Sequence, residues 1–191
     1  FPILESLRDD PSEYVRRSVA NHLNDIAKDH PDMVLEIAER WLREAGTSAS
    51  PRDRERLVKH ACRTLLKAGS GRAMILFGFR DPRDLAIQDL QIDRAEVRLG
   101  DAIEFDFKIT SRGPMGLVRL EYAVHYQKAN GTLSPKVFKI GEFASDETTR
   151  AVSRRHQFRD LTTRRHHPGP HRIEIRINGV PKAQAELLLS L

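Results

Sequence analysis

The sequence has 191 residues, of which 31% are charged and 39% are hydrophobic, and its formal net charge at pH 7 is +5. These proportions are those of a globular protein with one large or two small domains, and the positive charge favours a polyanionic partner such as nucleic acid. No apolar run reaches the roughly 18 residues of a membrane span, no signal peptide is visible, and the single cysteine excludes an internal disulfide, so we expect a cytoplasmic protein.

The first part of the chain, up to about Phe79, has helical periodicity. The expected helices cover residues 12–29, 31–46 and 51–69, followed by a short apolar segment over residues 73–77. Ser12 is expected to cap the first helix with its hydroxyl, and prolines open the second and third. Helices joined by short loops are typical of stacked helical repeats. Since the chain begins with Phe1 rather than methionine, we expect these repeats to continue upstream in a longer protein.

After a polar boundary over residues 79–85, which contains Pro82, the hydrophobic period changes to two. Apolar residues alternate with polar ones over residues 103–109, 118–126 and 173–177, which indicates strands with one buried and one wet face. The wet face of the second strand is expected to carry Arg119, Glu121, Ala123, His125 and Gln127. Further candidate strands lie at residues 88–98, 136–140, 151–159 and 183–190. Seven or eight strands favour an immunoglobulin-like sandwich over a closed barrel.

The polar side of the first helix offers a candidate DNA-binding surface with Arg16, Arg17, Asn21 and Asn24. The third helix adds Lys59, Arg63 and Lys67, whose spacing of four predicts a single line of cations. Such rows can follow the phosphates of DNA, and the alternative is an ordinary solvated helix face. Asp25 is a weak candidate for a catalytic carboxylate, and the alternative is an ion pair with a neighbouring base.

The densest positive charge lies between Arg150 and Arg176, where eight arginines and four histidines face only two carboxylates. The candidate phosphate contacts of this region are Arg154, Arg155, Arg159, Arg164 and Arg165. Charge that guards an exposed strand edge is the alternative. The histidines at 166, 167 and 171 suggest zinc, but adjacent histidines on an extended chain point to opposite sides and no cysteine completes a ligand set. We therefore expect no metal.

Two further residues are expected to be structural. Trp41 occupies an apolar helical position and is expected to anchor the core, with base stacking as the alternative. Cys62 lies on an apolar stripe and is expected to be a small core residue. The sequence contains no glycine-rich phosphate loop, no G-x-S-x-G elbow and no H-E-x-x-H motif, so we expect neither a nucleotide nor any other cofactor.

The segments EYVRRSVANHLNDIAKDHPDMVL, RERLVKHACRTLLKAG and MILFGF resemble the carboxyl-terminal repeats of the alkylpurine DNA glycosylases built from HEAT-like repeats, in particular the AlkC branch. Segments such as VRLGDAIEFDFKITS resemble the immunoglobulin-like domain of that branch. The resemblance implies an α+β protein of two domains, a HEAT-like helical-repeat solenoid segment over residues 1–79 and an all-β immunoglobulin-like sandwich over residues 80–191.

The resemblance also implies a function, namely the excision of cationic N3-alkylated bases from double-stranded DNA by a monofunctional glycosylase. Asn21 and Asn24 stand where AlkD-type relatives have a tryptophan and an arginine, and the catalytic aspartate of the family lies on an earlier repeat that no residue of this chain matches. The chain is therefore expected to bind the DNA backbone as the carboxyl-terminal portion of the enzyme. The alternative is a non-catalytic module for protein–protein interaction. The sequence leaves the oligomeric state open.

Overall fold

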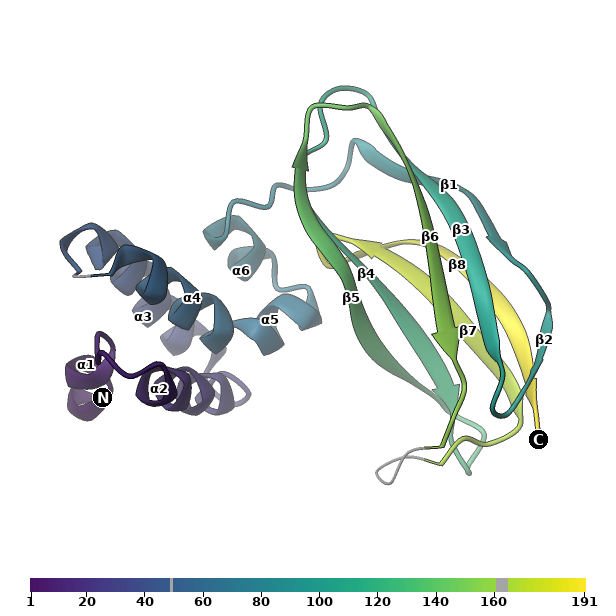
Figure 1. Ribbon diagram of the computed structural model, residues 1–191, viewed down its shortest axis with the longest axis horizontal. Helices are drawn as coiled ribbons and strands as arrows, with labels where there is room; N and C mark the ends of the chain where they lie inside the picture. Colours follow the sequence, from purple (N-terminus) through teal and green to yellow (C-terminus); the bar gives the residue numbers. More distant parts are fainter. Residues whose placement is uncertain (49, 161–164) are drawn as a thin grey trace. The chain divides into compact units, whose positions relative to one another are not determined.

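The computed structural model describes residues 1–48, 50–160 and 165–191, and the chain divides into two compact units, Phe1–Gly78 and Phe79–Leu191 (Figure 1). The first unit is helical and the second is built from strands. The helices of the described residues are α1 (Pro2–Leu7), α2 (Glu13–Ile26), α3 (Pro31–Arg43), the 3-10 turn η1 (Glu44–Thr47), α4 (Pro51–Ala61), α5 (Arg63–Ala68) and α6 (Gly71–Leu76). No helix of these described ranges is long and apolar enough to cross a membrane.

The predicted third helix is interrupted. Cys62 adopts φ −90° and ψ 8°, which is outside the helical region, and it separates α4 from α5. The break changes the direction in which the following side chains point. The prediction that Lys59, Arg63 and Lys67 form one line on a continuous helix is therefore wrong. As expected, Gly69 ends the second piece with a left-handed φ of 77°, which a residue without a Cβ adopts at no steric cost.

The start of α2 also differs from the expectation. The Ser12 side chain makes no capping hydrogen bond. Its backbone N–H instead donates to Asp10 Oδ1 at 2.8 Å, so the preceding loop organises the entry into the helix. The predicted Ser12 cap is thus wrong, whereas Val19 and Leu23 of the apolar stripe are buried as predicted.

Helix α1 has no buried residue and is held by charged side chains. Glu5 accepts hydrogen bonds from Trp41 Nε1 at 3.0 Å and from Arg40. Asp9, just beyond α1, accepts from Arg54 Nε at 2.8 Å and from Arg54 Nη2. Trp41 itself is 1% exposed, which confirms its predicted role as a core anchor.

The second unit contains two sheets, with strand orders β1-β3-β6 and β2-β8-β7-β4-β5. The strands are β1 (Leu85–Ile92), β2 (Glu96–Arg98), β3 (Ala102–Ser111), β4 (Gly116–Gln127), β5 (Leu133–Ser145), β6 (Thr149–Gln157), β7 (Gly169–Ile177) and β8 (Val180–Ser190). All pairings are antiparallel except the short one between β2 and β8. The predicted strand over residues 88–98 is wrong as a single element, because β1 and β2 belong to different sheets.

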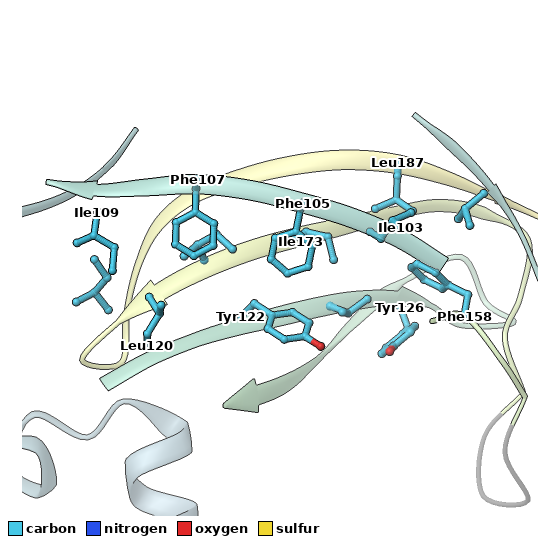
Figure 2. Close-up of a cluster of buried hydrophobic side chains, with 14 of the residues drawn as sticks. Ile103, Phe105, Phe107, Ile109, Leu120, Tyr122, Tyr126, Phe158, Ile173 and Leu187 are labelled. Carbon is cyan, nitrogen blue, oxygen red and sulfur yellow. The ribbon is translucent and has the colours of Figure 1, made fainter. Parts of the chain in front are cut away.

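The core of this unit lies between the two sheets (Figure 2). Phe105 and Phe107 point from β3 towards Leu120 and Tyr122 of β4, as their period of two predicts. The Phe105 ring meets the Tyr122 ring edge to face, with 5.2 Å between the centroids. Residues 79–85, where the domain boundary was predicted, belong to the second unit, and Phe79 and Leu85 are buried.

The outward face of β4 is not wet. Glu121 and Ala123 are 0% exposed, and Arg119 and His125 are buried as well. Arg119 donates to Glu121 Oε1 at 2.6 Å and to Glu142 of β5 at 2.5 Å, so neighbouring charged side chains cover one another. The prediction of a solvated face is wrong here because ion pairs across adjacent strands remove these groups from water.

Candidate functional site

A cleft between α2 and α4 brings charged side chains of both helices together. Its volume is about 180 Å³, and the side chains that line it are those of Glu13, Arg16, Arg17, Ala20, Asp53, Arg56, Leu57 and His60. Three arginines therefore face two carboxylates in one depression. We call it the α2–α4 cleft.

The two predicted arginines of α2 have different surroundings. Arg16 donates to the carbonyl oxygens of Asp10 at 2.7 Å and Pro11 at 2.9 Å, and it pairs with Asp53 at 3.1 Å. Its guanidinium thus joins α4 to the loop before α2, and little of its donor capacity is left for a ligand. Arg17 is exposed at the rim of the cleft, and so is Arg56 of α4. These two are the cations that the α2–α4 cleft presents to solvent.

Asn21 is connected to the same cleft by a contact with His60, which lines the cleft. The Asn21 Oδ1 atom is 2.9 Å from His60 Nε2, and an amide oxygen at this distance accepts a hydrogen bond from a protonated Nε2. Burial and the nearby positive charges of Arg63 and Arg17 lower the pKa of His60, so the neutral form prevails near pH 7. Arg63 also donates from Nη1 to the His60 carbonyl oxygen at 3.0 Å. Asn21, His60 and Arg63 therefore form one hydrogen-bonded group across α2, α4 and α5.

Asn24 does not lie on the exposed polar face on which the sequence placed it. It is 2% exposed, and its Oδ1 accepts a hydrogen bond from the backbone N–H of Thr64 at 3.1 Å. This N–H belongs to the first turn of α5, where helix geometry supplies no acceptor. The expectation of an exposed Asn24 is thus wrong, and its side chain has a structural role.

Replacing Asn24 by alanine is expected to lower the free energy of unfolding by about 1–2 kcal/mol, because a buried N–H loses its acceptor. The dependence of DNA binding on salt should stay that of the wild type. His22→Ala, at an exposed position of the same helix, is the matched control for stability. Urea unfolding followed by Trp41 fluorescence measures the difference, and equal stability of the two variants would contradict the structural role.

Lys59 and Asp25 lie apart from the α2–α4 cleft. Lys59 lines a different depression with Arg56 and Phe77, and its ammonium is 6.0 Å from the centre of the Phe77 ring. Asp25 pairs with Lys28 at 2.7 Å and is 66% exposed. The hydrogen bond from Lys28 lowers the pKa of this carboxyl group. The geometry of Asp25 is that of a solvated helix ion pair rather than of a water-excluded catalytic group.

In the second unit, the predicted phosphate contacts lie on β6 and in the segment after it. β6 is an edge strand, and an edge position is what the alternative, charge that guards a strand edge, requires. Arg154 and Arg155 point to opposite sides of the strand. Arg154 crosses to β5, where it donates to the Ile140 carbonyl oxygen at 3.0 Å, whereas Arg155 is exposed on the outer side. Arg159 and Arg165 are exposed, and Arg164 lies outside the described residues.

The histidines of the basic run point into the structure. The backbone N–H of His166 donates to Asp160 Oδ1 at 2.9 Å, and the same oxygen lies 3.1 Å from His166 Nδ1. His171 donates from Nδ1 to the Gly169 carbonyl oxygen at 3.0 Å, and burial lowers its pKa. Among residues 1–48, 50–160 and 165–191, no group of three or more histidine, cysteine or acidic side chains is placed to hold a metal ion.

The predicted site residues did not include Arg56, His60 or the lysines of the β4–β5 hairpin. Arg56 and His60 are four residues apart, so they lie on one face of the helix, next to the predicted line of Lys59 and Arg63. That spacing was a usable signal. Lys128 and Lys136 lie on either side of the turn between β4 and β5, and both line a depression with Arg165 of a distant segment.

Three similarities to known proteins bear on this site. Residues 86–191 match the family described as uncharacterised protein YhaZ, C-terminal Ig-like domain. Over 183 residues the chain is 41% identical to the uncharacterized protein YhaZ of Bacillus subtilis (strain 168), covering 95% of this chain and 49% of that protein. The structure of the Pseudomonas fluorescens alkylpurine DNA glycosylase AlkC, bound to DNA containing an abasic site analog, matches with a TM-score of 0.90 and 36% identity. That match covers 100% of this chain and 52% of the glycosylase, so the chain spans about half the length of these relatives.

Proposed function

Because the chain belongs to the family of the YhaZ carboxyl-terminal immunoglobulin-like domain and is similar over its whole length to a DNA-bound glycosylase, we propose that it acts in DNA alkylation repair. Its proposed partner is the backbone of double-stranded DNA, without a nucleotide cofactor. The observation that carries the proposal is the α2–α4 cleft, where Arg17 and Arg56 are exposed side by side on neighbouring helices.

The helical unit is proposed to be a segment of a HEAT-like solenoid, with residues 1–78 as the repeat domain and residues 79–191 as the sandwich. Such a segment presents side chains from successive helices along one surface. Guanidinium groups on that surface suit phosphate oxygens, because their planar donors match the geometry of the acceptors. Arg17 and Arg56 are the proposed phosphate contacts of the helical unit, and Asn21 and Arg63 support them through His60. Lys59 remains a candidate from its own depression.

The reaction proposed for the longer protein is the excision of cationic N3-alkylated bases. A positively charged base is a good leaving group, so the enzyme mainly needs a carboxylate to stabilise the cationic sugar and a positioned water. Asp25 is a poor choice for that carboxylate, since it is 66% exposed and paired with Lys28. We propose that the catalytic carboxylate belongs to the half of the relatives that this chain does not span. The present residues then serve to bind and position the DNA.

The test is duplex binding by the full chain and by the double variant Arg17→Gln/Arg56→Gln. For a duplex of about 20 base pairs, log affinity is plotted against log salt. The magnitude of the slope should decrease by about 0.9 for each phosphate contact removed, or by about two in the double variant. Arg43→Gln, which removes an exposed arginine from α3 outside the α2–α4 cleft, is the matched control and should keep the wild-type slope.

Two results would contradict the proposal. If the wild type does not bind the duplex at low salt, the chain has no DNA-binding role. If the double variant keeps the wild-type slope, the α2–α4 cleft is not part of the DNA interface. A wild type that ignores DNA but forms a stable complex with a protein partner favours the alternative of a protein-interaction module.

A further inference from the structure

His60 lies where charged side chains of three helices meet. It belongs to the lining of the α2–α4 cleft, to which α2 contributes Glu13, Arg16 and Arg17 and α4 contributes Asp53 and Arg56. Helix α5 adds Arg63, whose Nη1 donates to the His60 carbonyl oxygen at 3.0 Å. Among these side chains, the imidazole is the group whose charge changes between about pH 5 and pH 8.

The carboxylate of Asp53 is already shared between two arginines. Its Oδ2 lies 3.1 Å from Arg16 Nη2, and its Oδ1 lies 3.7 Å from Arg56 Nη1. The Arg56 side chain is 82% exposed, so its guanidinium remains accessible to a ligand. Glu13, the other carboxylate of the lining, is exposed in the first turn of α2, where solvent screens its charge.

The net electrostatic effect on His60 is therefore that of positive charge. Burial lowers the pKa of the ring, and the charges of Arg63 and Arg17 lower it further. Asp25 also lies within range of the Arg63 charge, but its carboxylate accepts a hydrogen bond from Lys28 at 2.7 Å. The free protein thus holds His60 as an uncharged ring among cations.

The hydrogen bonding of the His60 ring leaves a place for one more proton. Asn21 Oδ1 lies 2.9 Å from Nε2 and accepts a hydrogen bond when Nε2 is protonated. Within the described ranges of the chain, no hydrogen bond engages the other ring nitrogen, Nδ1. A proton added to Nδ1 leaves the bond to Asn21 in place and gives an imidazolium ring with two N–H donors. Protonation of the ring therefore needs no rearrangement of α2 or α4.

We propose that His60 is a conditional phosphate-binding residue, which takes up a proton from solvent on Nδ1 when a DNA phosphate enters the α2–α4 cleft. The proton returns to solvent when the DNA leaves. The inference rests on the proposed function, because it adds a third accessible cation to Arg17 and Arg56. Its physical reason is electrostatic. An anionic phosphate beside Arg17 offsets the charge that keeps the ring neutral, and it also attracts the imidazolium directly.

A purely structural role for His60 needs only the bond from Nε2 to Asn21, which joins α4 to α2. Such a role involves no change in the charge of the ring when DNA binds. The position of the ring in the lining of the cleft favours the coupled role, since a ligand of Arg17 then alters the field at the imidazole.

The coupling predicts a definite sign for the dependence of DNA binding on pH. The pKa of His60 should be higher in the complex than in the free protein. Between these two pKa values, binding takes up a proton, so the affinity rises as the pH falls. Above the higher pKa the affinity no longer depends on this proton. The full gain is about tenfold for each unit by which DNA raises the pKa.

The test follows the ring signals of the histidines in nuclear magnetic resonance spectra of the full chain at constant ionic strength. The pH is varied from about 8 to about 5, with and without a duplex of about 20 base pairs. We expect the duplex to raise the pKa of His60. The affinity of His60→Gln should lose the gain at low pH, whereas His30→Gln, at an exposed position outside the cleft, should keep it.

Arg17→Gln gives a second measurement of the coupling. Without the charge of Arg17, the pKa of His60 in the free protein should be higher and its rise on duplex binding smaller. A duplex that binds without raising the pKa of His60 overturns this inference alone, and so does a His60→Gln variant that keeps the full gain at low pH. A wild type that binds no duplex at any pH of the series rejects the proposed function together with this inference.

Discussion

Replacing Asp9 by alanine is expected to lower the free energy of unfolding of the helical unit by about 3 kcal/mol. Arg54 is 1% exposed, and Asp9 binds two of its guanidinium nitrogens. Without Asp9, the remaining acceptor is the Trp41 carbonyl oxygen at 3.4 Å, so a buried charge is left without its counter-ion. The value lies at the low end for a buried ion pair because the Asp9 side chain is 40% exposed.

Trp41 is the only tryptophan and lies in this unit, so its fluorescence during urea unfolding reports the helical unit alone. Asp29→Ala, at an exposed position after α2, is the matched control and should change stability by less than about 0.5 kcal/mol. An equal effect of the two substitutions would show that Arg54 does not depend on Asp9.

Burial raises the pKa of Asp9, but hydrogen bonds from Arg54 and Ser48 and the charge of Arg54 outweigh burial, and the net pKa lies below the ordinary value of 3.8. A carboxyl group whose pKa is depressed in the folded state stabilises that state fully above its unfolded pKa. The contribution is lost as pH falls through the folded pKa. The difference between wild type and Asp9→Ala should therefore shrink below about pH 4.

Replacing Phe105 by alanine is expected to lower the stability of the sandwich by about 3–5 kcal/mol. The ring is 0% exposed and contacts Phe107 and Tyr122, so its removal leaves a cavity between the two sheets (Figure 2). Asp106→Ala is the matched control, because the next residue of the same strand faces solvent. Calorimetry should show a lowered transition for the sandwich and an unchanged transition of the helical unit. A small effect of Phe105→Ala would place this ring outside the core.

Much of the fold was predictable because it depends on local periodicity. The period of two in β3 and β7 places the same residues in the core that the structure buries there. The apolar stripe of α2 was equally visible. The interruption at Cys62 was not, because its neighbours keep the apolar spacing of a continuous helix.

Features that depend on contacts between residues far apart in the chain could not be predicted from the sequence. Asp9 and Arg54 are 45 positions apart, and nothing in either segment indicates the other. The outward face of β4 has the polar pattern of a wet face, yet Arg119 pairs with Glu142 of the neighbouring strand. Asn24 was assigned to the surface for the same reason, since only the position of α5 shows that its amide accepts the Thr64 N–H.

The candidate site was predicted in part. Arg17 is exposed as the helix pattern required, whereas Arg16 is occupied by Asp53 and two carbonyl oxygens. The third predicted helix does line the same cleft as α2, but its lining residues include Arg56 and His60 and not Lys59 or Arg63. The role of all these residues in DNA binding stays a prediction.

The most direct test of the account is the salt dependence of duplex binding by the unmodified chain. With Arg17 and Arg56 as phosphate contacts, log affinity should fall linearly with log salt with a slope of about −2. The affinity should change little between duplexes of unrelated sequence, since these contacts do not read bases. Absence of binding at 50 mM salt, or a slope near zero, would contradict a DNA-backbone role for this protein.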